Sequence, residues 1–142
     1  MNKTAKQRRP PLKKTINANS FLVPYKSLTE VLQDHKLASL GDTYINFVYS
    51  LALSQKNKKP IGVKVKGSIL AEALRRAGLR EHVSSSMSCH DLADAVEALL
   101  VYSWLNECVT LDESVRMLMR SEDPVEGLRQ LLERIKSRIT LS

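Results

Sequence analysis

Three acidic side chains lie in apolar, helix-like stretches of this sequence and could together bind a metal ion. Asp94 and Glu97 are three residues apart in one such stretch, and Asp42 lies in an earlier one. Residues three apart in a helix share a face about one turn apart. Carboxylates at the margin of an apolar helix are costly to desolvate without a positive partner, and magnesium, which prefers oxygen ligands, is one such partner. A simpler interpretation of the pair is an exposed acidic edge that meets Lys or Arg from a neighbouring helix.

The stretch around Asp94 is predicted to be a helix over about residues 88–106. Ser88 is a good N-cap, and Asp91 three residues later nearly completes a capping box. Apolar residues then recur at helical spacing and should face a core. They are Leu92, Ala95, Val96, Leu99 and Leu100.

The stretch around Asp42 is predicted to be a helix over about residues 36–53. Its apolar residues are too many for one narrow face, so we expect this helix to be central. Gly41 lies within it and costs about 1 kcal/mol relative to Ala. A glycine at that cost indicates close approach of another backbone, such as that of the helix carrying Asp94.

Capping and turn signals predict four further helices. One begins at Ser27, and another covers residues 69–77 with Ser68 as N-cap and Gly78 after its end. The last two begin at Thr110 and at Asp123, where Pro124 follows. Residues 54–67 are expected to form a Lys-rich loop, because the alternating apolar residues there have no strand partner. The prediction is an all-α fold of about six helices, with a domain over residues 21–142 and a basic, extended or disordered arm over residues 1–20.

The composition is that of a globular protein in a reducing compartment. The chain has 142 residues, of which 43% are hydrophobic, enough for one domain with a core. We expect a cytoplasmic protein, because there is no apolar run of membrane-spanning length and no secretory signal. Cys89 and Cys108 should be too far apart to bridge. With His82 and His90 they lack zinc-site spacing, so we expect thiols and surface histidines.

Positive charge is concentrated in two clusters. The net charge is +7, and half of all Lys and Arg residues lie in two segments without an acid, residues 3–14 and residues 56–66. Clustered charge of this kind is typical of nucleic-acid binding. The candidate RNA-binding residues are Lys6, Arg8, Arg9, Lys13, Lys14, Lys56, Lys58, Lys59, Lys64, Lys66, Arg75 and Arg76.

The two acidic segments, in this order, resemble the signatures of the ribonuclease III catalytic domain. The first is Leu40-Gly41-Asp42, and the second is the Asp-x-x-Glu-Ala segment over residues 94–98, followed by an apolar stretch with aromatics. The resemblance covers roughly residues 27–119. It implies an all-α domain that forms a homodimer. It also implies that Asp42, Asp94 and Glu97 are catalytic and bind Mg²⁺, with Mn²⁺ as a substitute, beside a phosphate of double-stranded RNA.

The sequence departs from the longer members of this family at two positions. Those members carry two further Glu residues in the first signature, where this chain has His35 and Ala38. We also expect no double-stranded-RNA-binding domain after the helical one. Compact mini-ribonucleases III share the missing domain and a small residue at the position of Ala38.

These observations favour a metal-dependent endoribonuclease that acts on double-stranded or structured RNA, ribosomal RNA among them. One alternative is a catalytically silent relative that binds structured RNA, for example on the ribosome. The other is a helical adaptor that binds proteins through its last two helices and has no nucleic-acid partner.

Overall fold

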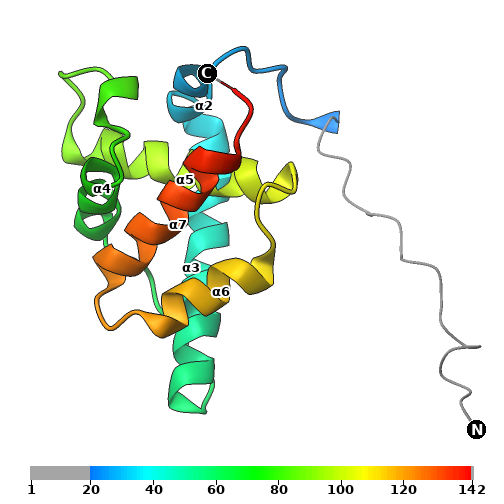
Figure 1. Cartoon of the computed structure of the whole chain (residues 1–142), viewed down its shortest axis with the longest axis vertical. Helices are drawn as coiled ribbons and strands as arrows, with labels where there is room; N and C mark the ends of the chain where they lie inside the picture. The colour runs from blue at the N-terminus through cyan, green and yellow to red at the C-terminus, as the bar shows by residue number, and fades with distance from the viewer. Residues whose placement is uncertain (1–19, 142) are drawn as a thin grey trace, which may run out of the picture.

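The chain forms an all-α fold, as the sequence predicts. The structure is a computed structural model that describes residues 20–141, and within this range it contains six α-helices, one short 3-10 helix and no β-strand (Figure 1). Of the predicted arm over residues 1–20, all but Ser20 lies outside the described residues. The elements are α2 (Leu28–Leu32), α3 (His35–Asn57), α4 (Gly67–Arg76), η2 (Arg80–His82), α5 (Cys89–Leu105), α6 (Leu111–Arg120) and α7 (Pro124–Arg138).

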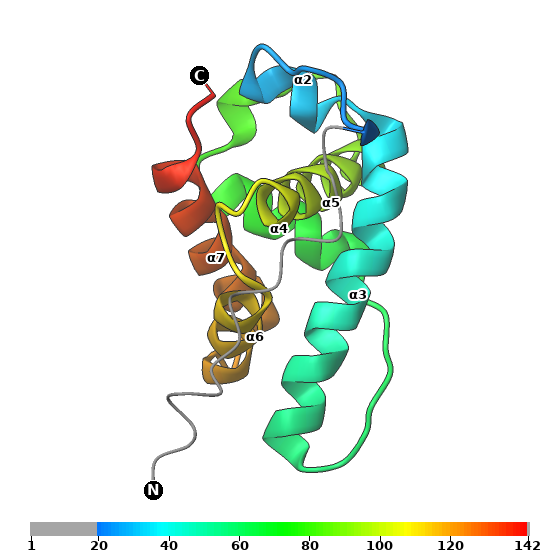
Figure 2. The ribbon, with the colours of Figure 1, turned by 90° about the vertical axis from the view of Figure 1, so that its right-hand side faces the viewer.

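Helix α5 is the buried centre of the fold. It packs against α2, α3 and α4, and Figure 2 shows it nearly end-on among its neighbours. Most of its residues are buried, from Leu92 to Leu105. We expected the helix over residues 36–53 to be central, and this was wrong, because α3 leaves Leu40 and Phe47 exposed on its outer side. An apolar residue on every side of a helix therefore does not show that every side is covered.

The helix ends follow most of the predicted capping signals. Ser88 with Asp91 and Thr110 with Glu113 both form capping boxes. Gly78, just after α4, has a φ of +75°, the left-handed conformation in which glycine commonly ends a helix. The prediction that Ser68 caps α4 was wrong, because the helix begins at Gly67 and no side chain caps it.

Helix α3 is longer than predicted and is followed by an extended segment. It continues to Asn57, and Lys58 ends it in the left-handed conformation. Residues 59–66 then run back along α3 toward α4 without forming a strand (Figure 2). We call residues 59–66 the strap. The expected Lys-rich loop is therefore present, but it is shorter than predicted.

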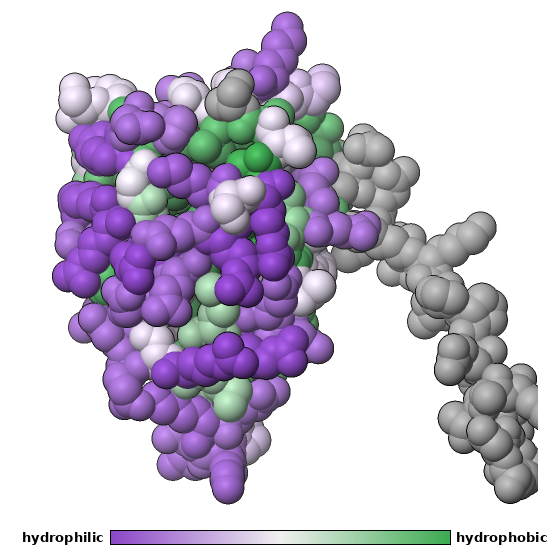
Figure 3. Space-filling view, in the orientation of Figure 1, coloured by the Kyte–Doolittle hydropathy of each residue, from purple (hydrophilic) through white to green (hydrophobic). Residues whose placement is uncertain are grey.

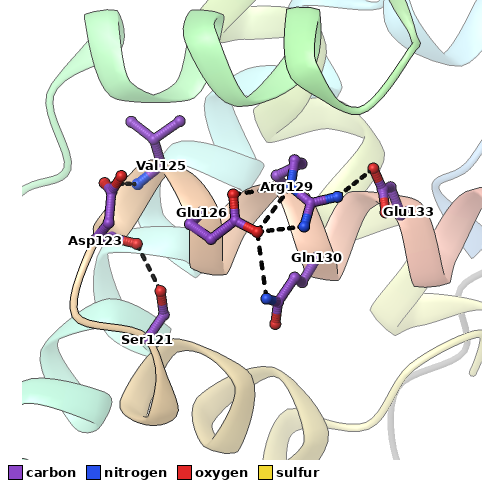
Figure 4. A network of polar contacts seen from close by, with 7 residues as sticks. All are labelled: Ser121, Asp123, Val125, Glu126, Arg129, Gln130 and Glu133. Carbon is purple, nitrogen blue, oxygen red and sulfur yellow. Dashed lines mark hydrogen bonds and ion pairs between the residues drawn. The ribbon is translucent and has the colours of Figure 1, made fainter.

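Helix α7 is capped by an acid, and its Arg129 is neutralised by glutamates of the same helix. Asp123 caps the helix by accepting a hydrogen bond from the Val125 amide at 3.0 Å. Arg129 pairs with Glu126 on one side and Glu133 on the other (Figure 4). The face that carries α6 and α7 is mostly hydrophilic (Figure 3). No helix within residues 20–141 is long and apolar enough to cross a membrane.

Helices α3 and α5 touch at Gly41. A Cβ atom placed on this glycine would lie 1.9 Å from the carbonyl oxygen of Glu97. The predicted close approach of the two helix backbones is therefore confirmed, and it places Asp42 next to the part of α5 that carries Asp94 and Glu97. Any side chain at position 41 would force these helices apart.

Replacing Gly41 with Ala should destabilise the protein by about 3 kcal/mol, because overpacking against a backbone exceeds the helix-propensity gain of about 1 kcal/mol. Urea unfolding measures the change. The matched control is Gly62→Ala, since a Cβ atom at Gly62 meets nothing within 4 Å. Equal stabilities of the two variants would contradict the close contact.

Candidate functional site

The three acids singled out by their spacing line one pocket. Asp42 enters it from α3, and Asp94 and Glu97 enter it from α5. The start of α4 closes one side of this pocket at Gly67. We call this the acid pocket. Acids that are more than fifty residues apart in the chain are thus brought together by the α3–α5 crossing.

Glu97 is the most deeply buried acid of the pocket, with 8% of its surface exposed. Burial is the main effect that raises the pKa of Glu97 to about 8, and a hydrogen bond with Asp42 and the charges of Asp42 and Asp94 add to it. The nearby Lys64 lowers this pKa, but by less. The neighbouring carboxylates therefore act on Glu97 more strongly than the one nearby lysine does.

Asp94 faces two histidines. Its Oδ2 atom lies 3.2 Å from Nδ1 of His35 and 3.8 Å from Nε2 of His90. His35 is the first residue of α3, where Asp34 caps the helix. His35, which stands where longer family members have a Glu, lines the acid pocket although its side chain is 64% exposed. The expectation that His90 is a surface histidine is confirmed, because its side chain is 84% exposed. Its position four residues before Asp94 accounts for the contact.

Asp42 is held by a residue that the sequence analysis did not single out. The Nδ2 atom of Asn46 donates a hydrogen bond to Oδ1 of Asp42 at 3.1 Å. Asn46 follows Asp42 by one helical turn, so the i, i+4 spacing was the available signal.

The donor atoms of the acid pocket suit a hard divalent cation. Three carboxylates offer only oxygen ligands, and their unbalanced charge favours a cation such as Mg²⁺. Within the described part of the chain, however, no three His, Cys, Asp or Glu side chains are already arranged to hold a metal ion. Asp42 and Glu97 already adjoin each other, whereas Asp94 turns toward His35.

The basic candidates divide into residues near the acid pocket and residues with other partners. Lys64 lines the pocket, and Lys66 directly precedes α4. Lys58, which ends α3, and Lys59, the first residue of the strap, are both exposed.

The remaining basic candidates have partners or lie outside the described residues. Arg75 and Arg76 both pair with Glu72, at 3.3 and 3.0 Å. Lys56 lies 3.5 Å from Glu122. The basic candidates outside the described residues are Lys6, Arg8, Arg9, Lys13 and Lys14.

Comparison with known proteins identifies the family. The family model described as Ribonuclease III matches residues 35–139, which include both acidic segments and α3 to α7. No curated protein matches the chain. The chain belongs to the ribonuclease III family, and the predicted resemblance is confirmed.

Replacing Glu97 with Gln should stabilise the metal-free protein by about 2 kcal/mol at pH 8 and by much less at pH 5. Folding raises the pKa of Glu97 from 4.5 to about 8. As the pH rises between these values the unfolded state loses its proton first, so the wild-type protein loses stability that the variant keeps. Urea unfolding in EDTA across this pH range measures the difference.

The control for this experiment is Glu122→Gln, because the Glu122 side chain is 92% exposed. Its stability difference from the wild type should stay small at every pH. A gain for Glu97→Gln that is the same at pH 5 and pH 8 would contradict the burial of an ionisable carboxyl group.

Proposed function

We propose that this protein is a metal-dependent endoribonuclease that cleaves double-stranded or structured RNA, ribosomal RNA among its candidate substrates. The observation that carries the proposal is the convergence of Asp42, Asp94 and Glu97 on one pocket of a ribonuclease III domain. These residues would be both the catalytic residues and the metal ligands. Mg²⁺ is the proposed cofactor, and Mn²⁺ is a proposed substitute.

The acid pocket supports this chemistry through its charge. When bound, a divalent cation would lower the pKa of a water molecule, direct it in line at the phosphodiester and offset charge on the leaving oxygen. Asp42 and Glu97 adjoin each other across the α3–α5 crossing and would supply oxygen ligands from both helices. Asp94 would supply the third carboxylate once its oxygen is released from His35. Loss of the proton on Glu97 would accompany metal binding, because the ligand must be ionised.

The strap supports binding of RNA phosphates beside the acid pocket. Among the described residues, the exposed side chains of Lys58, Lys59, Lys64 and Lys66 have no carboxylate within ion-pair distance. Duplex RNA is recognised largely through its shape and its phosphates, for which free lysines are suited. Lys56, Arg75 and Arg76 would contribute less while they remain paired with Glu residues.

Replacing Asp94 with Asn should lower magnesium-dependent cleavage of duplex RNA at least about 100-fold, because a ligand carboxylate is lost. Cleavage by the full chain is measured on a labelled duplex with and without EDTA. Asp112→Asn is the matched control, since Asp112 is exposed on α6, and it should cut like the wild type. The Asp94→Asn variant should still bind the duplex, with an affinity that falls as salt rises. Equal cutting by all three proteins would refute the assignment of Asp94.

A catalytically silent RNA-binding protein, for example a ribosome-associated one, is the second candidate function. The contact between His35 and Asp94 favours it, because a histidine replaces a Glu of the longer relatives and occupies a candidate ligand. Duplex binding by the wild-type protein without any magnesium-dependent turnover would select this alternative.

An apolar surface on α3 supports the homodimer that the family resemblance implies. Leu40 and Phe47 are 43% and 55% exposed, and their spacing of two helical turns puts them on one side of α3. Beside them, Phe47, Leu51, Ile61 and Val63 line a groove between α3 and the strap. We propose that a second copy of the chain covers this surface.

Replacing Phe47 with Glu should convert the dimer to monomers, because it places a charge in the apolar contact. Analytical ultracentrifugation at several protein concentrations measures the change. Val23→Glu provides the control, since Val23 is equally exposed but precedes α2. A variant that stays dimeric, or a monomeric wild type, would exclude this surface as the dimer interface.

A further inference from the structure

The strap is fastened to α3 by three polar side chains, one per helical turn. Ser54 Oγ accepts a hydrogen bond from the Ile61 amide at 2.8 Å and donates to the Ile61 carbonyl at 3.1 Å. Ser50 makes the same pair of bonds with Val63, at 2.9 and 3.1 Å.

The third fastening is made by Asn46, whose Oδ1 accepts from the Val65 amide at 2.8 Å. The three bonded positions have nearly the same spacing on α3 and on the strap. Four residues of helix rise about 6 Å, and two residues of extended chain rise about 6.6 Å.

Asn46 differs from the two serines because it also contacts the acid pocket. Its Nδ2 atom donates to Oδ1 of Asp42 at 3.1 Å. The Val65 amide fixes the orientation of this side chain, since a backbone N–H can only donate and must therefore face Oδ1, which leaves Nδ2 facing Asp42. The side chain therefore cannot turn over without losing its bond to Val65.

The geometry points to Asn46 as a positioning residue that orients the Asp42 carboxylate for the metal ion, an inference that rests on the function proposed above. With Oδ1 held by Asn46, the Asp42 carboxylate is fixed beside Glu97. The same amide anchors Val65, the residue after Lys64, and so holds that lysine at the rim of the acid pocket. One side chain thus sets the position of an acid from α3 and of a cation from the strap.

Two variants separate these roles. Asn46→Ser should keep the strap in place, because Ser50 and Ser54 make the equivalent bonds at the same register, but it loses the donor to Asp42. Ser50→Ala removes two strap bonds and leaves the bond between Asn46 and Asp42 intact.

The readout is binding of MgCl₂ to the full chain, measured by calorimetry and by the rise in melting temperature. Asn46→Ser should weaken magnesium affinity about tenfold, the effect usual for residues that hold a metal ligand. Its melting temperature in EDTA should stay near that of the wild type. Ser50→Ala should show the opposite pattern, with a lower melting temperature in EDTA and unchanged magnesium affinity. On RNA, Asn46→Ser should lower kcat at saturating substrate and leave KM unchanged.

The outcomes distinguish failure of this inference from failure of the proposed function. Magnesium binding by the wild type with an unchanged affinity in Asn46→Ser would overturn the positioning role alone. Equal losses of magnesium affinity in Asn46→Ser and Ser50→Ala would also overturn it, because the strap rather than Asp42 would be responsible. No magnesium binding and no cleavage by the wild type would overturn both the inference and the metal-dependent function.

Discussion

The contact between Gly41 and the backbone of Glu97 is the constraint on which the rest of the structure depends. Two helices can approach this closely only where a residue lacks a side chain, and here the glycine directly precedes Asp42. The partner backbone belongs to Glu97 itself, so the closest point of the crossing and the acid pocket are the same place. The same contact therefore determines both the packing of α3 on α5 and the position of the candidate catalytic acids. A shift of α3 relative to α5 would change the fit of the core and the spacing of the acids together.

The acid pocket is a site where stability and function oppose each other. Burying Glu97 beside Asp42 and Asp94 raises the pKa of Glu97, which is a free-energy cost to the metal-free fold. The surrounding core offsets this cost, because α5 is buried along most of its length against three other helices. A cation in the pocket would remove the repulsion that the core now tolerates. Without the cation, a proton on Glu97 removes part of this repulsion, because it leaves Glu97 neutral beside Asp42.

Local sequence signals predicted the elements better than the contacts between them. The capping boxes at Ser88 and Thr110 and the close helix contact at Gly41 could be predicted from the sequence. Each of them depends on a few neighbouring residues or on one severe steric demand. The length of α3 could not be predicted in this way, because its last turn is polar and is stabilised by a left-handed Lys58 and by the strap. The acids of the candidate site were identified from type and spacing. The contact between Asp94 and His35 could not be identified from the sequence, because the distance between these residues depends on the tertiary fold.

The hydrogen bonds between α3 and the strap limit how the strap can change in length. Alternate strap residues bond to α3 through their backbone amides, so Lys64 lies between two anchored neighbours. Substitutions at the unanchored positions leave this pattern intact, whereas inserting or deleting one residue would exchange the anchored and unanchored sets. Such a change would put Lys64 in an anchored position and take Val65 out of the position in which it is buried. Natural or engineered variants must therefore preserve the number of residues between the anchored positions of the strap more than the identity of those residues.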